Sequence, residues 1–289
     1  MRVDAHVHAF ETAGRHDLRN STQVFPDGRR EPVEQLLADF SAAQIDAAVL
    51  VALPGQEAYV LRALAEHREQ LAGVLTMEGR RQWPSADDLE RWASSGVAGL
   101  RFTSLADAER LAGSAAALAR GLGDLGGRGL TVSCFLPAHE WSFLARLASQ
   151  LPSTRFVLNH CGLPRGDSRV DEWRRPRSLA AWQNGSSADV FADMENVWVC
   201  LSGSYAYSSQ EPPYRDVQEW AAHLVVRFGP QRLMRGSDYP WVRTRPGYAA
   251  ELETFDDLLD DLTDDAAAAV RGTNAQTAFF SGRRDCITT

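Results

Sequence analysis

Short apolar segments alternate with longer segments of helical length along the whole chain. The short segments are rich in Val, Leu and Phe, which is typical of parallel strands that are covered on both faces. The longer ones are amphipathic or rich in Ala, Leu and Arg, as expected of helices. Strands are predicted at residues 2–8, 47–53, 71–78, 97–103, 130–136, 155–161, 196–202 and 232–238. Helices are predicted at residues 33–44, 57–70, 85–95, 105–122, 139–150, 217–228, 248–262 and 264–280.

This alternation defines the expected fold. Eight strands separated by helices favour a closed parallel barrel over an open sheet, so we predict an α/β protein with a (β/α)8 TIM barrel. No change in composition suggests a second domain, and residues 1–289 are expected to form a single barrel domain. The irregular stretches all follow predicted strands, on the side of a barrel where active sites lie. They are residues 9–31, 162–184, 204–215 and 240–247.

The first predicted strand contains two histidines, His6 and His8. Because side chains alternate along a strand, Asp4, His6 and His8 should share one face, and the apolar Val3, Ala5 and Val7 the other. If the apolar residues pack outward on the helices, both histidines lie inside the barrel near its mouth. Two buried imidazoles are costly unless they bind a metal, a substrate or a proton partner. A hydrogen-bonded structural pair is the alternative.

Two other strand ends carry polar side chains. His160 ends the sixth strand within Asn-His-Cys-Gly, and Asp238 ends the eighth shortly before Pro240. Alone, His160 could be structural and Asp238 could cap a turn. With His6 and His8 they would form a His-His-His-Asp site. Such a site suits a divalent cation with an open coordination position, or a metal-free arrangement that activates water.

Composition narrows the partners and the chemistry. The net charge of −8 argues against nucleic acid or an anionic membrane as a partner. All 30 basic residues are arginine, which excludes a lysine Schiff base, a lysine general base and a carbamylated-lysine metal bridge. The four cysteines form no C-x-x-C pair, and no apolar leader or membrane-length run is present. We expect a cytoplasmic enzyme that acts on a small molecule, and a homo-oligomer is compatible with the sequence.

Six segments, taken in order, resemble the amidohydrolase superfamily. Within it the similarity is to the amidohydrolase-2 branch of TIM-barrel hydrolases, which includes sugar lactonases and the 2-pyrone-4,6-dicarboxylate lactonase type. The segments are D-A-H-V-H at the start, G-L-R-F at 99–102, F-V-L-N-H-C-G at 156–162, N-V-W-V-C-L-S-G at 196–203, G-S-D-Y-P-W at 236–241 and R-G-T-N-A at 271–275.

The resemblance implies roles for individual residues. His6, His8, His160 and Asp238 match the central four of the family, in which the aspartate takes a proton from the attacking water. The histidines bind a metal in some members and polarise the scissile carbonyl directly in others. One divalent cation, with zinc as the first choice, is therefore the expected cofactor, and metal-free catalysis is the alternative. Arg101 matches an arginine that binds a substrate carboxylate in the lactonases.

The sequence also departs from the family pattern. Cys200 stands where relatives commonly read V-K-L-S-G, and no bridging lysine or glutamate is apparent on or near the fifth strand, so a two-metal centre is not expected. The seventh strand has no histidine, unlike some decarboxylase relatives. We therefore predict a hydrolase that opens a lactone or related cyclic acyl compound. The alternatives are a metal-dependent, non-oxidative decarboxylase, and a barrel of this fold that binds a ligand or catalyses a non-hydrolytic biosynthetic rearrangement.

Further candidates surround the predicted mouth. His139 follows the fifth strand and is either a proton shuttle or an exposed residue of the next helix. Tyr205 and Tyr207 follow the seventh strand, and Trp241 and Arg243 follow the eighth. We predict substrate-binding roles for His139, Tyr205, Trp241 and Arg243, although aromatic side chains in these loops could equally pack loop against loop. The same two interpretations apply to Trp83, Trp173 and Trp182.

Overall fold

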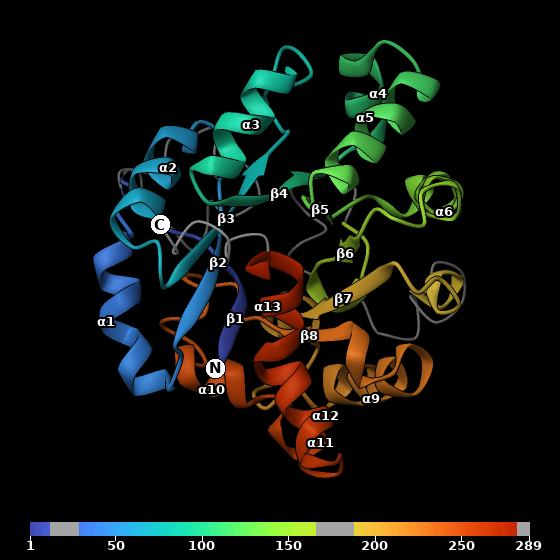
Figure 1. Ribbon diagram of the computed structural model, residues 1–289. Helices are drawn as coiled ribbons and strands as arrows, with labels where there is room; N and C mark the ends of the chain where they lie inside the picture. Colours follow the sequence, from blue (N-terminus) through green and yellow to red (C-terminus); the bar gives the residue numbers. More distant parts are fainter. Residues whose placement is uncertain (12–28, 166–187, 282–289) are drawn as a thin grey trace.

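Eight parallel strands form the predicted barrel. The computed structural model describes residues 1–11, 29–165 and 188–281. The strands pair in sequence order from β1 to β8, and helices surround them (Figure 1). This confirms the TIM-barrel prediction, and each strand lies within its predicted range. The strands are β1 (Val3–Val7), β2 (Ala47–Val51), β3 (Leu71–Thr76), β4 (Val97–Phe102), β5 (Thr131–Cys134), β6 (Phe156–Leu158), β7 (Val197–Leu201) and β8 (Leu233–Arg235).

The barrel closes between β1 and the residues that follow β8. The Asp238 amide donates to the His6 carbonyl at 2.9 Å, and the His8 amide donates to the Tyr239 carbonyl at 2.7 Å. Three predicted site residues, His6, His8 and Asp238, therefore lie where main-chain hydrogen bonds close the barrel. Their side chains are fixed relative to one another by main-chain hydrogen bonds rather than by a loop.

The helices lie outside the strands, apart from α13 (Asn274–Phe279), which crosses the middle of the barrel in Figure 1. In the described part of the chain, none is both long and apolar enough to cross a membrane. The others are α1 (Val33–Ala43), α2 (Glu57–Glu66), α3 (Ala86–Ser94), α4 (Leu105–Ala112), α5 (Ala115–Gly127), α6 (Trp141–Gln150), α8 (Ser204–Tyr207), α9 (Arg215–Phe228), α10 (Tyr248–Glu253), α11 (Asp256–Asp260) and α12 (Asp264–Ala268).

Three predicted helices are broken in the structure. The helix predicted at 105–122 ends at Gly113, whose φ of 93° is left-handed, and Ser114 caps the next helix by accepting from the Ala117 amide. The helix predicted at 248–262 divides into α10 and α11. The one predicted at 264–280 contains a π-helical turn, Ala269–Thr273. Periodicity alone does not show these breaks, because the apolar pattern continues across them.

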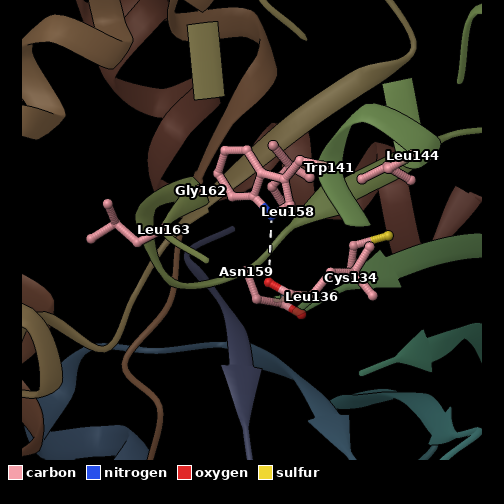
Figure 2. Close-up of a pocket in the computed structure, with 8 residues that line it drawn as sticks. All are labelled: Cys134, Leu136, Trp141, Leu144, Leu158, Asn159, Gly162 and Leu163. Carbon is pink, nitrogen blue, oxygen red and sulfur yellow. Dashed lines mark hydrogen bonds between the residues drawn. The ribbon is translucent and has the colours of Figure 1, made fainter. Parts of the chain in front are cut away.

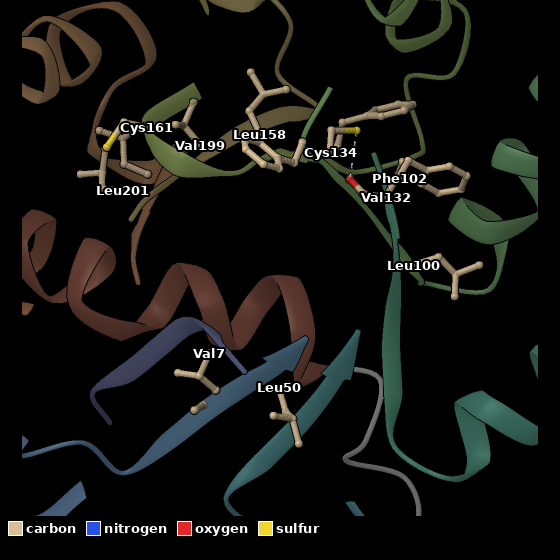
Figure 3. Close-up of a cluster of buried hydrophobic side chains, with 14 of the residues drawn as sticks. Val7, Leu50, Leu100, Phe102, Val132, Cys134, Leu158, Cys161, Val199 and Leu201 are labelled. Atoms are coloured by element: carbon tan, nitrogen blue, oxygen red, sulfur yellow. Dashed lines mark hydrogen bonds between the residues drawn. The ribbon is translucent and has the colours of Figure 1, made fainter. Parts of the chain in front are cut away.

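The core has two layers. Side chains that point away from the barrel pack against the helices, among them Leu50, Leu100, Phe102, Val132 and Leu158 (Figure 3). A second cluster fills the inside, where Val49, Val157 and Met234 pack with Ala278 and Phe279 of α13. The Thr131 hydroxyl, at the start of β5, donates to the Ala278 carbonyl at 2.8 Å. Helix α13 therefore covers the amino-terminal ends of the strands, opposite the predicted active-site mouth.

The prediction for the first strand is wrong for three residues. Val3 and Ala5 pack in the inner cluster instead of outward. Asp4 pairs with Ala48 on β2, and its carboxylate accepts from the Ser237 amide at 2.9 Å and the Ser237 hydroxyl at 2.6 Å. A register shift between Asp4 and Val7 is the cause, since an inserted residue reverses the alternation. Asp4 consequently does not share a face with His6 and His8.

Candidate active site

His6 and His8 are both buried, at 0% and 2% exposure, and their Nε2 atoms lie 3.3 Å apart. The Nδ1 atom of His8 lies 2.7 Å from the Val51 carbonyl oxygen. This nitrogen must therefore carry the proton, which leaves the lone pair on Nε2. The Nδ1 atom of His6 lies 3.3 Å from the Asn159 side-chain amide. Both rings are thus oriented through Nδ1, with Nε2 turned to the same point.

Asp238 faces that point with one of its two carboxylate oxygens. Its Oδ1 atom lies 3.6 Å from His6 Nε2 and 3.4 Å from His8 Nε2. Oδ1 is buried without a hydrogen-bond partner in the described structure, whereas Oδ2 accepts from the Tyr205 hydroxyl at 2.8 Å. The residue itself has a left-handed backbone, with φ 64°, which few residues other than glycine adopt, although aspartate tolerates it better than most. The chain turns sharply here because it leaves β8 and presents the carboxylate inward.

His160 comes from a turn of three consecutive left-handed residues after β6, at φ 52°, 56° and 60°. Its ring centroid lies 4.9 Å from that of His6, and its Nδ1 atom lies 3.2 Å from the Ser202 hydroxyl. Gly203 provides room for the ring, since a Cβ there would approach Nδ1 to 2.8 Å. The structure therefore brings all four predicted central residues to one place, with His160 against His6.

The buried environment sets the charges. The pKa of His160 is lowered to about 4, chiefly by burial; Asp238 opposes this shift, while Arg101 and His8 contribute to it. Burial, followed by the charges of His160, His8 and Arg101, keeps the pKa of His6 well below its ordinary value. Burial raises the pKa of Asp238, but the neighbouring His160 and His8 outweigh it, and the net shift is downward. At neutral pH the site is a carboxylate beside neutral imidazoles of His6 and His160.

Three of these residues could hold a metal ion. One ligand atom each from His6, His8 and Asp238 lies within 4.8 Å of the others, and all three residues are buried. Imidazole nitrogens and a carboxylate oxygen are ligands typical of zinc, and three protein ligands leave a position for water. The unpartnered Oδ1 of Asp238 also fits such an ion. His160 lies outside this group, so the described residues favour three protein ligands over the predicted four.

Arg101 reaches the site from β4. Its side chain is buried, its Nε has no hydrogen-bond partner in the described structure, and its guanidinium carbon lies 5.5 Å above the Phe135 ring. Phe135 in turn packs edge-on against His160, with 4.5 Å between ring centroids. Burial lowers the pKa of Arg101, and the charges of Asp238 and Glu78 oppose this shift. The result is a buried cation beside the imidazoles, which suits a substrate anion.

The remaining candidates separate into two groups. Tyr205 bonds to Asp238, and the Trp241 ring lies 5.9 Å from that of His8. Arg243 instead pairs with Glu31 at 3.0 Å and Asp39 at 3.3 Å. His139 is exposed in a short 3-10 turn, Ala138–Glu140. Trp83 packs on Phe102, while Trp173 and Trp182 lie outside the described residues.

A small pocket lies behind the site rather than in it. Figure 2 shows Trp141 and Leu144 of α6 facing Cys134 and Leu158 of the strands, with Asn159 at one side. The lining is mostly apolar and belongs to the layer between strands and helices.

The buried thiols offer no nucleophile. Burial raises the pKa of Cys134, of Cys161 to about 12, and of Cys200.

The sequence interpretation missed the residues that orient the histidines. Asn159 contacts His6, and its carbonyl oxygen accepts from the Ser133 hydroxyl at 2.9 Å. The Ser202 hydroxyl accepts from the backbone amide of His160 and also lies 3.2 Å from the Nδ1 atom of His160. Asn159 directly precedes His160, and Ser202 lies two residues after Cys200; both belong to segments that resemble the family. Their partners come from other strands, so only the barrel register reveals the contacts.

The sequence matches a family profile, and the fold is shared with solved structures. The amidohydrolase family profile matches residues 3–280. A putative 2-pyrone-4,6-dicarboxylic acid hydrolase from Pseudomonas putida superposes with a TM-score of 0.70 at 23% identity, over 96% of this chain and 97% of that one. An amidohydrolase from Burkholderia multivorans with bound zinc gives 0.73 at 19% identity, over 96% and 99%. A probable 2-pyrone-4,6-dicarboxylic acid hydrolase from Acinetobacter baumannii with bound citric acid gives 0.70 at 17%, over 96% and 98%. Among curated proteins, none matches the sequence.

Proposed function

Because the chain belongs to the amidohydrolase family, we propose that it hydrolyses a lactone or related cyclic ester that carries a carboxylate. The central observation is the unpartnered Oδ1 of Asp238, which is buried 3.4 Å from His8 and 3.6 Å from His6. A buried carboxylate oxygen with no partner is unfavourable unless a ligand, a water molecule or a metal ion occupies the position in front of it. That requirement matches a general base that must hold its water before the reaction.

Asp238 acts as the general base in this proposal. Its Oδ1 accepts a proton from water as the water oxygen attacks the substrate carbonyl, and its Oδ2 stays bound to Tyr205. His160 presents Nε2 to the carbonyl oxygen because Ser202 holds Nδ1, and a neutral imidazole can donate there. The ester C–O bond then breaks, and the ring oxygen leaves with the proton to give a hydroxy acid.

His6, His8 and Asp238 are the residues that would hold a zinc-like ion. Such an ion, when bound, would lower the pKa of water and polarise a carbonyl. Without lysine in the sequence, a carbamylated-lysine bridge to a second ion cannot form. A single ion is therefore the proposed cofactor.

Arg101 selects the substrate. Its guanidinium is buried beside Phe135, so its charge is poorly screened by water and attracts an anion strongly. A carboxylate matches the planar fork of the guanidinium. We propose that the substrate places its carboxylate at Arg101 and its carbonyl carbon near Asp238.

The test combines elemental analysis of the purified protein with a panel of lactones. The panel contains 2-pyrone-4,6-dicarboxylate, other aromatic lactones and sugar lactones, each with and without a free carboxylate where the chemistry allows. We expect the ring-opened acid as the product and a higher kcat/KM for the carboxylated member of each pair. Release of carbon dioxide would favour the decarboxylase, and binding without turnover would favour a protein that no longer hydrolyses. Either result contradicts the proposal.

A further inference from the structure

Tyr207 is a second tyrosine of α8, two residues after Tyr205, and its hydroxyl has no partner. Its side chain is buried, with 7% exposure, and its ring centroid lies 6.4 Å from that of His160. The hydroxyl is fully buried and makes no hydrogen bond in the described structure. The hydroxyl of Tyr205, in contrast, is bonded to Asp238 at 2.8 Å. In the described structure the Tyr205 hydroxyl therefore has an acceptor, whereas the Tyr207 hydroxyl has none.

An unpartnered hydroxyl needs an explanation. A buried donor left without an acceptor destabilises the fold, because it has lost its hydrogen bonds to water and gained none. Phenylalanine would fill the same space against His160 and avoid that cost. The hydroxyl therefore contributes nothing to the packing of α8, and the simplest explanation is a ligand that supplies the acceptor.

Two other unpartnered buried atoms lie around the same imidazole. Arg101 Nε and Asp238 Oδ1 are both buried without a hydrogen bond in the described part of the chain. The Phe135 ring lies against His160, with 4.5 Å between ring centroids, and the Arg101 guanidinium carbon lies 5.5 Å from the centre of the Phe135 ring. Tyr207 packs on the same imidazole directly, with 6.4 Å between ring centroids. Arg101 and Tyr207 therefore both border the surroundings of His160.

The electrostatics support the same arrangement. Burial raises the pKa of Tyr207, and Cys161 and Asp238 raise it as well. Arg101 and Arg165 act in the opposite direction. The phenol therefore keeps its proton at neutral pH and can only donate to an anion. Asp238 is not the acceptor in the described structure, since Oδ2 accepts from Tyr205, Oδ1 faces the histidines, and neither oxygen is bonded to Tyr207.

We propose that Tyr207 is a substrate-binding residue whose hydroxyl donates a hydrogen bond to the carboxylate that Arg101 holds. This deepens the proposed function, on which it rests for the identity of the substrate but not for the anion site itself. The carboxylate would lie between a cation and a neutral donor. Tyr205 and Tyr207 would then serve the base and the substrate respectively.

Citrate binding, measured by isothermal titration calorimetry at pH 7, tests this assignment without any turnover. Citrate carries three carboxylates and no ester bond. The proteins are wild type, Tyr207→Phe, Arg101→Gln and, as the matched control, Tyr205→Phe, which loses the same hydroxyl two positions away. We expect Tyr207→Phe to raise the dissociation constant at least about tenfold, the effect of a lost hydrogen bond to a charged group. Arg101→Gln should raise it further, and Tyr205→Phe should leave it within about twofold, since its partner is not the ligand.

Three results would overturn the assignment. They are unchanged citrate affinity in Tyr207→Phe, an equal loss in Tyr205→Phe, and no citrate binding by the wild type. Thermal unfolding of each variant shows whether it is folded. If Tyr207→Phe does not fold, Tyr207→His, which is smaller and keeps a ring with an N–H donor, replaces it and should bind citrate more tightly than Arg101→Gln. Should the wild type bind citrate through Tyr207 yet open no lactone, the hydrolytic function fails while the anion site stands.

Discussion

The Tyr205 hydroxyl donates to Oδ2 of Asp238 at 2.8 Å, and this single hydrogen bond makes the two oxygens of the carboxylate unequal. Oδ1 is left facing His6 and His8 without a partner in the described structure. A carboxylate that could rotate freely would offer either oxygen to water, in many geometries. The bond from Tyr205 restricts it to one.

Removal of that hydroxyl should therefore affect the chemical step more than substrate binding. In Tyr205→Phe we expect kcat to fall about 10- to 100-fold, because misplacement of a catalytic group by a fraction of an ångström has effects of this size. KM should change little, since Tyr205 does not contact the proposed carboxylate. Steady-state kinetics with the best lactone of the panel provide the measurement. A raised KM at constant kcat would instead assign Tyr205 to the substrate.

Zinc affinity should distinguish His8, which belongs to the ligand cluster, from His160, which does not. His8→Gln removes one of the three clustered ligands, and we expect its zinc affinity to fall by more than about 100-fold, beyond the 10- to 100-fold typical of lost outer partners. His160→Gln should keep most of its affinity, because His160 lies outside the cluster. Competition with a chromophoric chelator measures both. Equal losses in the two variants would restore His160 as a fourth ligand.

Glu251 should make the stability of the fold depend on pH. The pKa of Glu251 is raised from 4.5 to about 8, chiefly by burial; the Ser204 hydrogen bonds oppose this shift, and the charges of Asp238 and Asp4 contribute to it. The folded state thus holds a proton that the unfolded state has lost between pH 4.5 and about 8, so stability falls as pH rises through that window. The slope for one such group is at most about 1.4 kcal/mol per pH unit.

Glu251→Gln, which resembles the protonated side chain, should lack this slope and be more stable than wild type near pH 8. Urea unfolding at several pH values measures the difference. Glu253→Gln is the matched control, because Glu253 is exposed on the same helix. If Glu251→Gln and wild type keep a constant difference from pH 5 to 9, Glu251 does not titrate as described.

The barrel could be predicted from the sequence because its strands are short, apolar and separated by segments of helical length. The proximity of His160 and Asp238 to the first strand could be predicted because both follow strands at the same end of the barrel, where active sites of such barrels lie. The orientation of Asp4 was not accessible. Alternation assigns it to the face of His6 and His8, but a bulge within β1 reverses the phase, and nothing in the local residue pattern marks the inserted position.

The roles of the loop residues also required the structure. Arg243 was predicted to bind substrate, yet it pairs with Glu31, a residue 212 positions earlier, and with Asp39. Tyr205 was expected to bind substrate and instead contacts the carboxylate of Asp238. Sequence spacing gives no distance between segments that far apart, so it cannot show which charge is already paired.

The most direct test of the account is the turnover of Asp238→Asn. Asparagine keeps the shape and can still accept from Tyr205, but it cannot take a proton from water. With the best lactone of the panel, we expect kcat to fall by at least about 10³-fold, within the range for removal of a general base. Citrate should bind the variant at least as tightly as wild type, since a buried negative charge near Arg101 has been removed, and thermal unfolding shows that the variant is folded. Ring opening by Asp238→Asn at more than a tenth of the wild-type rate would contradict the assignment of Asp238 as the base.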